Sequence, residues 1–179
     1  NNGEIDAFIS KFNPDGTKVW TKLLGSSRSD LGHALTIGAD GSIFIAGSTR
    51  GDLDGQTNNG GWGDVFISKF NADGTKDWTR LLGTSDSDNG NALTTGSDGS
   101  IYIAGYTDGD LDDQTNHGDS RDAFISKLNA DGTKIWTRLL GTSSLDFALA
   151  LTTSSDGSIF IGGYTAVSYT HLRAHETLI

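Results

Sequence analysis

The stretch DAFISK at residues 6–11 returns as DVFISK at 64–69 and as DAFISK at 122–127, at a constant spacing of 58 residues. The residues between these stretches repeat as well, and the first copy aligns with the second without a gap. A repeat of this length is one supersecondary unit that buries its apolar residues only by stacking on its neighbours. The sequence therefore specifies architecture more clearly than chemistry.

The repeats divide the chain into one array and a short tail. Residues 1–165 form the array, with copies at 6–63, 64–121 and 122–165. The tail, residues 166–179, has no counterpart in any copy. Its segment VSYTHLRAHET resembles the translation of a sequencing adaptor, so we exclude it from the reasoning about the fold. The alternative is a short amphipathic helix.

Each repeat contains four runs rich in β-branched and aromatic residues, which predict strands. In the first copy they span 6–13, 18–25, 33–39 and 42–49. Tight and long connections alternate between them. Each tight connection carries an Asp-Gly pair, a strong hairpin signal because Gly accepts a positive φ. These pairs are Asp15-Gly16, Asp40-Gly41, Asp73-Gly74, Asp98-Gly99, Asp131-Gly132 and Asp156-Gly157.

Tandem four-stranded units of this length are typical of β-propeller blades. We predict an all-β fold made of tandem four-stranded antiparallel blades of a partial, open β-propeller. The order of the runs suggests 33–39 as the inner strand of a blade, which gives two whole blades at about 33–83 and 91–141, flanked by half-blades. Connections in a meander alternate between its two ends, so all the long loops should share one face. That face is the candidate binding surface.

The motifs D-A-F-x-x-K-x-x-x-D-G-x-x-x-W and D-G-x-I/V-Y-I/V-x-G run through residues 6–165 and resemble the bacterial SBBP (beta-propeller) repeat. The linker GDLDGQTNNGG resembles the version found in cyanobacterial surface or secreted proteins. The resemblance implies a propeller in an extracellular or cell-surface bacterial protein, and no defined catalytic activity. Trp20, Trp78 and Trp136 are similar to the docking tryptophans of quinoprotein propellers, which pack between blades.

Composition narrows the range of functions. The 179 residues have a formal net charge of −10, which disfavours nucleic acid as a partner. No apolar run approaches the roughly 20 residues of a membrane span. The chain contains no cysteine, which excludes disulfides and thiolate metal sites.

The most acidic long loop offers a candidate Ca²⁺ site. Asp108, Asp110 and Asp112 occupy positions 1, 3 and 5 of a loop whose position 12 is Asp119, and such carboxylates suit a hard cation. Asp113 stands where an EF-hand loop needs glycine, so the motif is incomplete. The alternative is a solvated, charge-rich turn. No other cofactor is indicated.

The remaining candidates belong to the same face. Trp62 and Tyr106 lie near the long loops and offer rings for stacking on a sugar, or for packing at the ends of strands. We therefore predict a non-enzymatic structural or interaction module with a protein or carbohydrate ligand at the loops, and with further blades stacked at its ends. The alternative is a fragment of a propeller enzyme, a polysaccharide lyase or hydrolase, whose active site lies in other blades.

Overall fold

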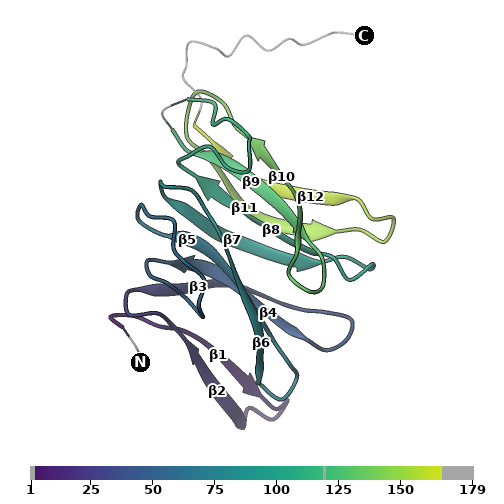
Figure 1. Ribbon diagram of the computed structural model, residues 1–179. Helices are drawn as coiled ribbons and strands as arrows, with labels where there is room; N and C mark the ends of the chain where they lie inside the picture. Colours follow the sequence, from purple (N-terminus) through teal and green to yellow (C-terminus); the bar gives the residue numbers. More distant parts are fainter. Residues whose placement is uncertain (1–2, 119, 167–179) are drawn as a thin grey trace.

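A computed structural model describes residues 3–118 and 120–166, and the described chain is entirely β (Figure 1). The tail beyond Ala166 and the predicted ligand Asp119 lie outside the described residues. The strands are β1 (Ala7–Phe12), β2 (Lys18–Leu24), β3 (Asp30–Ile37), β4 (Ile43–Thr49), β5 (Asp64–Phe70), β6 (Lys76–Leu82), β7 (Asp88–Thr95), β8 (Ile101–Thr107), β9 (Asp122–Leu128), β10 (Lys134–Leu140), β11 (Asp146–Thr153) and β12 (Ile159–Thr165). No helix among the described residues is long and apolar enough to cross a membrane.

The strands form two whole antiparallel blades and two half-blades. Blade A is β3-β4-β5-β6 and blade B is β7-β8-β9-β10. The hairpins β1-β2 and β11-β12 are the half-blades, and they lie at opposite ends of the stack (Figure 1). This arrangement confirms the predicted fold class and the predicted start of each blade at the strand that begins near residue 33.

The first strand of each blade is its innermost strand. β7 contacts both β3 and β11, so these three strands line the inner side of the stack. Hydroxyl groups connect them: Thr95 donates to the carbonyl of Ile37, and Thr153 donates to the carbonyl of Thr95. Equivalent hydrogen bonds between inner strands thus connect blade A to blade B and blade B to the half-blade β11-β12.

A β-bulge in each inner hairpin supplies a second tie. The register between β3 and β4 shifts between Gly32 and Ala34, so residue 33 is the extra one. The ring of His33 lies 3.2 Å from the carbonyl oxygen of Gly90 in blade B. Asn91, at the equivalent bulge, donates to the carbonyl of Ala148 at 2.9 Å.

Apolar side chains fill the space between neighbouring blades. Phe66 and Phe124 on the middle strands are fully buried. Trp78 contacts Phe44 within blade A, with ring centroids 6.1 Å apart, and its ring also lies under Gly132, in a tight turn of blade B. This contact confirms the predicted packing role of the outer-strand tryptophan.

Candidate ligand-binding loop face

The tight Asp-Gly turns lie on one side of the stack and the long loops on the other, as the meander predicts (Figure 1). We call the second side the loop face. It consists of the long loops 50–63 and 108–121 and the shorter loops 25–29, 83–87 and 141–145. All these loops begin or end at strands whose terminal residues are buried, so the strands fix the positions of the loops.

A row of buried aspartate and threonine side chains runs under the loop face. In blade A, Thr49 pairs with Asp30 on one side and with Asp64 on the other, and all three are fully buried. Blade B repeats the row with Asp88, Thr107 and Asp122.

The aspartates of the inner strands hold the shorter loops. The Oδ2 atom of Asp30 accepts hydrogen bonds from the backbone amide of Ser26 at 2.6 Å and from its hydroxyl at 2.9 Å. Asp88 accepts the same pair from Thr84, and Asp146 from Thr142. A carboxylate that accepts two such bonds fixes the conformation of the five-residue segment that ends at it.

The aspartates of the middle strands hold the long loops. Asp64 accepts hydrogen bonds from the backbone amide and the side-chain amide of Asn59. In the next repeat His117 replaces Asn59, and its Nδ1 lies 2.7 Å from Oδ2 of Asp122. Burial raises the pKa of Asp64, and the hydrogen bonds from Asn59 oppose this shift.

Each long loop is anchored by a leucine and an aspartate. Leu53 and Leu111 insert between blades and are almost completely buried. The next residue, Asp54 or Asp112, has a positive φ and turns its carboxylate toward the outer strand of its own blade. Asp112 contacts the Lys134 ammonium group and the Thr137 hydroxyl there. Both long loops are therefore packed against the blades. We call loop 50–63 the first strap and loop 108–121 the second strap.

The predicted calcium ligands have separate protein partners in this arrangement. The Nε group of Arg121 donates to Asp108 at 2.9 Å, and the amide of Asn116 donates to Asp110 at 2.8 Å. Asp112 is bound to β10, as described above. Among residues 3–118 and 120–166, no three acidic or histidine side chains converge as a metal-binding group. Calcium binding stays a prediction.

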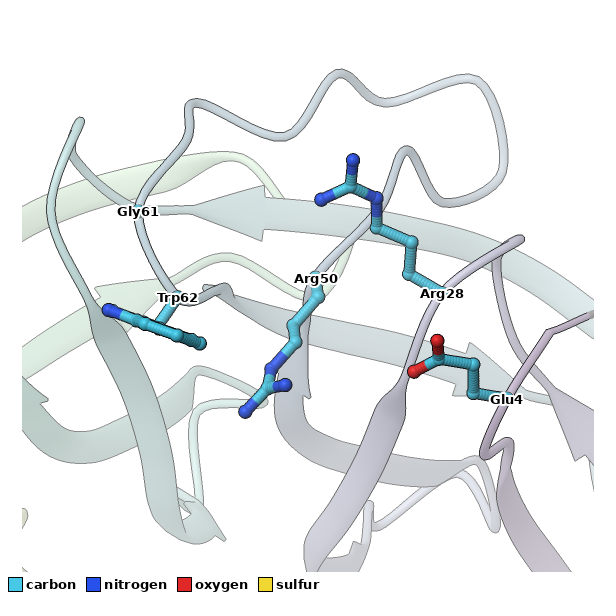
Figure 2. A pocket seen from close by; sticks show the side chains of 5 residues that line it. All are labelled: Glu4, Arg28, Arg50, Gly61 and Trp62. Carbon is cyan, nitrogen blue, oxygen red and sulfur yellow. The ribbon is translucent and has the colours of Figure 1, made fainter.

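The loop face contains a cavity of about 480 Å³ between the half-blade β1-β2 and blade A. Its lining residues are Glu4, Arg28, Arg50, Gly61 and Trp62. Figure 2 shows Trp62 and Glu4 at opposite ends, with the two arginine side chains between them. We call this cavity the arginine–tryptophan pocket.

The side chains of the pocket are accessible and carry unpaired positive charge. Trp62 is 75% exposed, and the Arg50 guanidinium carbon lies 5.4 Å from its ring centroid, a cation–π contact. Neither Arg28 nor Arg50 forms an ion pair with a described residue. Glu4 accepts a hydrogen bond from the Ser29 hydroxyl at 3.0 Å, which holds its carboxylate at the far end.

A glycine explains the position of Trp62. Gly61 has a φ of 62°, and a Cβ atom there would meet the carbonyl oxygen of Asp86 at 2.1 Å. The loop therefore lies directly against blade B, and the Trp62 amide donates to the Ser87 hydroxyl at 3.3 Å. The indole is held by backbone contacts and not by burial of its ring.

The corresponding place one repeat later has the opposite charge. Asp86, Asp108 and Ser120 stand 58 residues after Arg28, Arg50 and Trp62. Tyr106, the second predicted stacking residue, is covered by the Arg121 guanidinium at 4.6 Å and by the Phe147 ring at 4.8 Å. Only Trp62 of the two candidate rings presents an open surface.

Sequence reasoning missed the two arginines because they lie 22 residues apart in two different loops. The signal was present in the repeat alignment, where Arg28 and Arg50 both become aspartate in the second copy. The buried aspartate row was also missed. Its signal was an acidic residue four positions after Ser26, Thr84 and Thr142 in every copy.

Two comparisons with known proteins agree with this fold. Residues 77–112 match the SBBP family, described as a beta-propeller repeat, and this stretch runs from β6 into the second long loop. The regulatory protein FlaEY of Caulobacter vibrioides is 30% identical over 160 residues, which is 83% of this chain. The chain spans about a sixth (17%) of the length of that protein. The similarities therefore support a repeat-based, propeller-like module. A similar stretch occurs in a much longer bacterial regulatory protein.

Proposed function

We propose that this chain is a non-enzymatic interaction module that binds an acidic carbohydrate through its loop face. The observation that carries the proposal is the arginine–tryptophan pocket, where two arginines that form no ion pair with a described residue lie on one side of an exposed indole. The similarity to the Caulobacter protein, which is named as a regulatory protein, supports a binding role over a catalytic one.

The chemistry of the pocket selects the ligand class. A guanidinium group binds a carboxylate through two parallel hydrogen bonds, and an indole face stacks on the apolar face of a sugar ring. Arg50 covers part of Trp62, so a ligand would stack on the uncovered part and place its carboxylate toward Arg28. A uronic acid unit combines these two features.

Calorimetric titration tests the proposal with an oligogalacturonate and a neutral galactose oligomer of the same length. We expect binding of the acidic oligomer only, and a weakening of about tenfold or more in Arg50→Ala and in Trp62→Ala. Arg138→Ala is the matched control, because Arg138 also covers a tryptophan, Trp136, but on outer strand β10. Equal binding of both oligomers, or an unchanged affinity in Arg50→Ala, would refute the proposal.

Calcium at the second long loop is the other part of the proposal. The ligands would be Asp108, Asp110 and Asp112 together with Asp119, and binding would require Asp112 to release Lys134. A calcium titration of the wild type and of Asp110→Ala, followed by calorimetry and melting temperature, tests it. No heat and no change in melting temperature in the wild type would exclude the metal.

The proposed location is the exterior or surface of a bacterial cell, where carbohydrate ligands and further blades of the same protein would be available. Protease treatment of intact bacterial cells that produce this chain checks this location. Release of shortened sugar products by a protein that joins this chain to other blades, and not by this chain alone, would favour the alternative of a lyase or hydrolase with its site in those blades.

A further inference from the structure

Blades A and B enclose a cavity of about 260 Å³ on the outer side of their junction. Ile67 on β5 and Leu82 on β6 line it from blade A, and Leu128 on β9 lines it from blade B. The remaining walls are the second half of β6 and the tight turn that leads into β10. Both blades have four strands, so whole blades bound the cavity on both sides. It shares no lining residue with the arginine–tryptophan pocket.

The repeat provides a direct comparison for this cavity. The same positions 58 residues earlier lie between the hairpin β1-β2 and blade A, and they carry identical residues except at two places. Leu128 stands where the earlier copy has Phe70, and Arg80 stands where it has Lys22. The two differences therefore affect the volume of the cavity and the cationic group that lines it.

A phenyl ring occupies the corresponding position one repeat earlier. Phe70 is 2% exposed and packs in one cluster with Ile9 and Leu24. Leu128 is also buried, in a cluster with Ile67, but its side chain lacks the outer atoms of a phenyl ring. Because protein interiors are close-packed, a shortened side chain leaves space that its neighbours fill only in part. The cavity is therefore expected where a ring is missing, and Leu128 lines it.

Arg80 supplies the cavity with a positive charge. Its guanidinium group donates to the carbonyl oxygens of Thr79 at 2.9 Å and of Asp131 at 3.2 Å, and it forms no ion pair with a described residue. Lys134, the other cationic lining residue, is paired with Asp112. The N–H groups of Arg80 that these two carbonyls do not use remain for an acceptor in the cavity.

We propose that the cavity between blades A and B binds a small aromatic carboxylate, with its ring in the space that Phe70 fills one repeat earlier and its carboxylate on Arg80. An apolar cavity of about 150 Å³ holds a benzene molecule, so this cavity has room for a ring with a short acidic side chain. Sites for drug-sized ligands span about 300–1,000 Å³, so the cavity is too small for an oligosaccharide. A guanidinium group binds a carboxylate through two parallel hydrogen bonds. This site is independent of the proposed carbohydrate site.

NMR titration of the full chain with phenylacetate tests the proposal. Acetate and 2-phenylethanol are the comparison probes, because the first lacks the ring and the second lacks the charge. We expect saturable binding of phenylacetate with amide shifts at Ile67, Leu128 and Gly132, and binding of both comparison probes that is weaker by about tenfold or more. Arg80→Lys should weaken the binding of phenylacetate, because an ammonium group lacks the planar fork of a guanidinium group.

Exchanging residues between the two copies gives matched variants. Leu128→Phe places a ring in the cavity, so it should abolish phenylacetate binding and raise the melting temperature of the ligand-free protein. Phe70→Leu opens the corresponding space beside Lys22, so it should lower the melting temperature and create a second site for phenylacetate. Each variant carries a residue that the chain already has at the equivalent position, and circular dichroism checks that the fold is kept.

Several results would overturn the proposal. The first is the absence of saturable phenylacetate binding to the wild type. Undiminished binding in Leu128→Phe would place the ligand elsewhere, and shifts confined to loops 25–29 and 50–63 would assign it to the arginine–tryptophan pocket. Equal affinity for phenylacetate and 2-phenylethanol would refute the role of Arg80. If Leu128→Phe does not fold, Phe70→Leu decides, because a single site in that variant would refute the link between the missing ring and binding.

Discussion

Burial raises the pKa of the Asp88 carboxyl group in blade B, and the charge of Asp64 in blade A adds to this effect. The backbone brings them together, because the amide of Asp88 donates to the carbonyl of Gly63 at 2.8 Å. Burial is the larger cause, and together they raise the pKa of Asp88 to about 6, against hydrogen bonds from Thr107 and Thr84. A blade junction of this protein therefore contains a carboxyl group that titrates near neutral pH.

Asp88 should make the fold less stable as the pH rises from 4 to 6. Below the unfolded-state pKa of 3.8 the group is neutral in both states and costs nothing. Between 3.8 and 6 the unfolded chain ionises first, so unfolding becomes easier, by at most about 3 kcal/mol. Thermal melts should show a higher melting temperature at pH 4.5 than at pH 7.5.

Asp88→Asn separates this effect from other titrations. The variant should show a smaller decrease between pH 4.5 and 7.5, because its side chain stays neutral while Asp64, whose pKa burial also raises, still ionises. Asp98→Asn is the matched control. Hydrogen bonds from Ser100 lower the pKa of Asp98 to about 2, so its contribution is lost only between pH 3.8 and 2. An undiminished decrease in Asp88→Asn would show that another group causes it.

Gly61→Ala should distort the loop that carries Trp62. The new methyl group meets the Asp86 carbonyl, and the φ of 62° disfavours any side chain, so we expect a loss of about 2–4 kcal/mol of unfolding free energy. Gly55→Ala has a similar φ of 75° but open space, and should cost only about 1 kcal/mol. Urea titration measures both. Equal losses would mean that contact with blade B does not position the loop.

Leu111→Ala should destabilise the junction between blades A and B. Leu111 is 1% exposed and packs in one cluster with Ile67 and Phe124, so its truncation leaves a cavity and costs about 2–5 kcal/mol. The side chain of Ile135 is half exposed, so Ile135→Ala should lower the free energy of unfolding by less than about 1 kcal/mol. If chemical denaturation shows only a small loss of unfolding free energy in Leu111→Ala, the second strap is not part of the core.

Asp112→Ala should loosen the second strap more than Asp110→Ala does. Asp112 contacts both Lys134 and Thr137 on β10, and its loss should cost about 1–3 kcal/mol. Asp110 accepts one amide hydrogen bond from Asn116, worth about 1 kcal/mol. Amide hydrogen exchange of residues 110–116 reports the difference. Faster exchange in Asp110→Ala than in Asp112→Ala would reverse this ranking of the two anchors.

The repeat period and the Asp-Gly turns were sufficient to predict the strands, the blades and the side on which the loops lie. These features depend on local residue types and on a pattern that recurs in all three copies of the repeat. The blade phase was also predictable from the order of the runs, which suggested 33–39 as the inner strand, and β3 indeed begins blade A.

The details of the loop face were not predictable for a physical reason. Asp112 was expected to face a cation, but a lysine 22 residues later lies beside it because the strap folds back over β10. The pocket combines Arg28 and Arg50 from two loops that the pairing of β3 with β4 brings together, since the Arg50 amide donates to the Ser29 carbonyl. Such contacts depend on how strands and loops far apart in the sequence fold onto one another within a blade, which the local residue pattern does not show.

Calorimetric titration with an oligogalacturonate tests the account most directly, because it asks whether the arginine–tryptophan pocket binds an acidic sugar. The wild type should bind the acidic oligomer and not the neutral galactose oligomer, and Arg50→Ala should weaken binding by about tenfold or more. Arg138→Ala should bind as the wild type does, because Arg138 covers Trp136 on β10, outside the pocket. Equal binding of both oligomers, or an unchanged affinity in Arg50→Ala, would contradict the account.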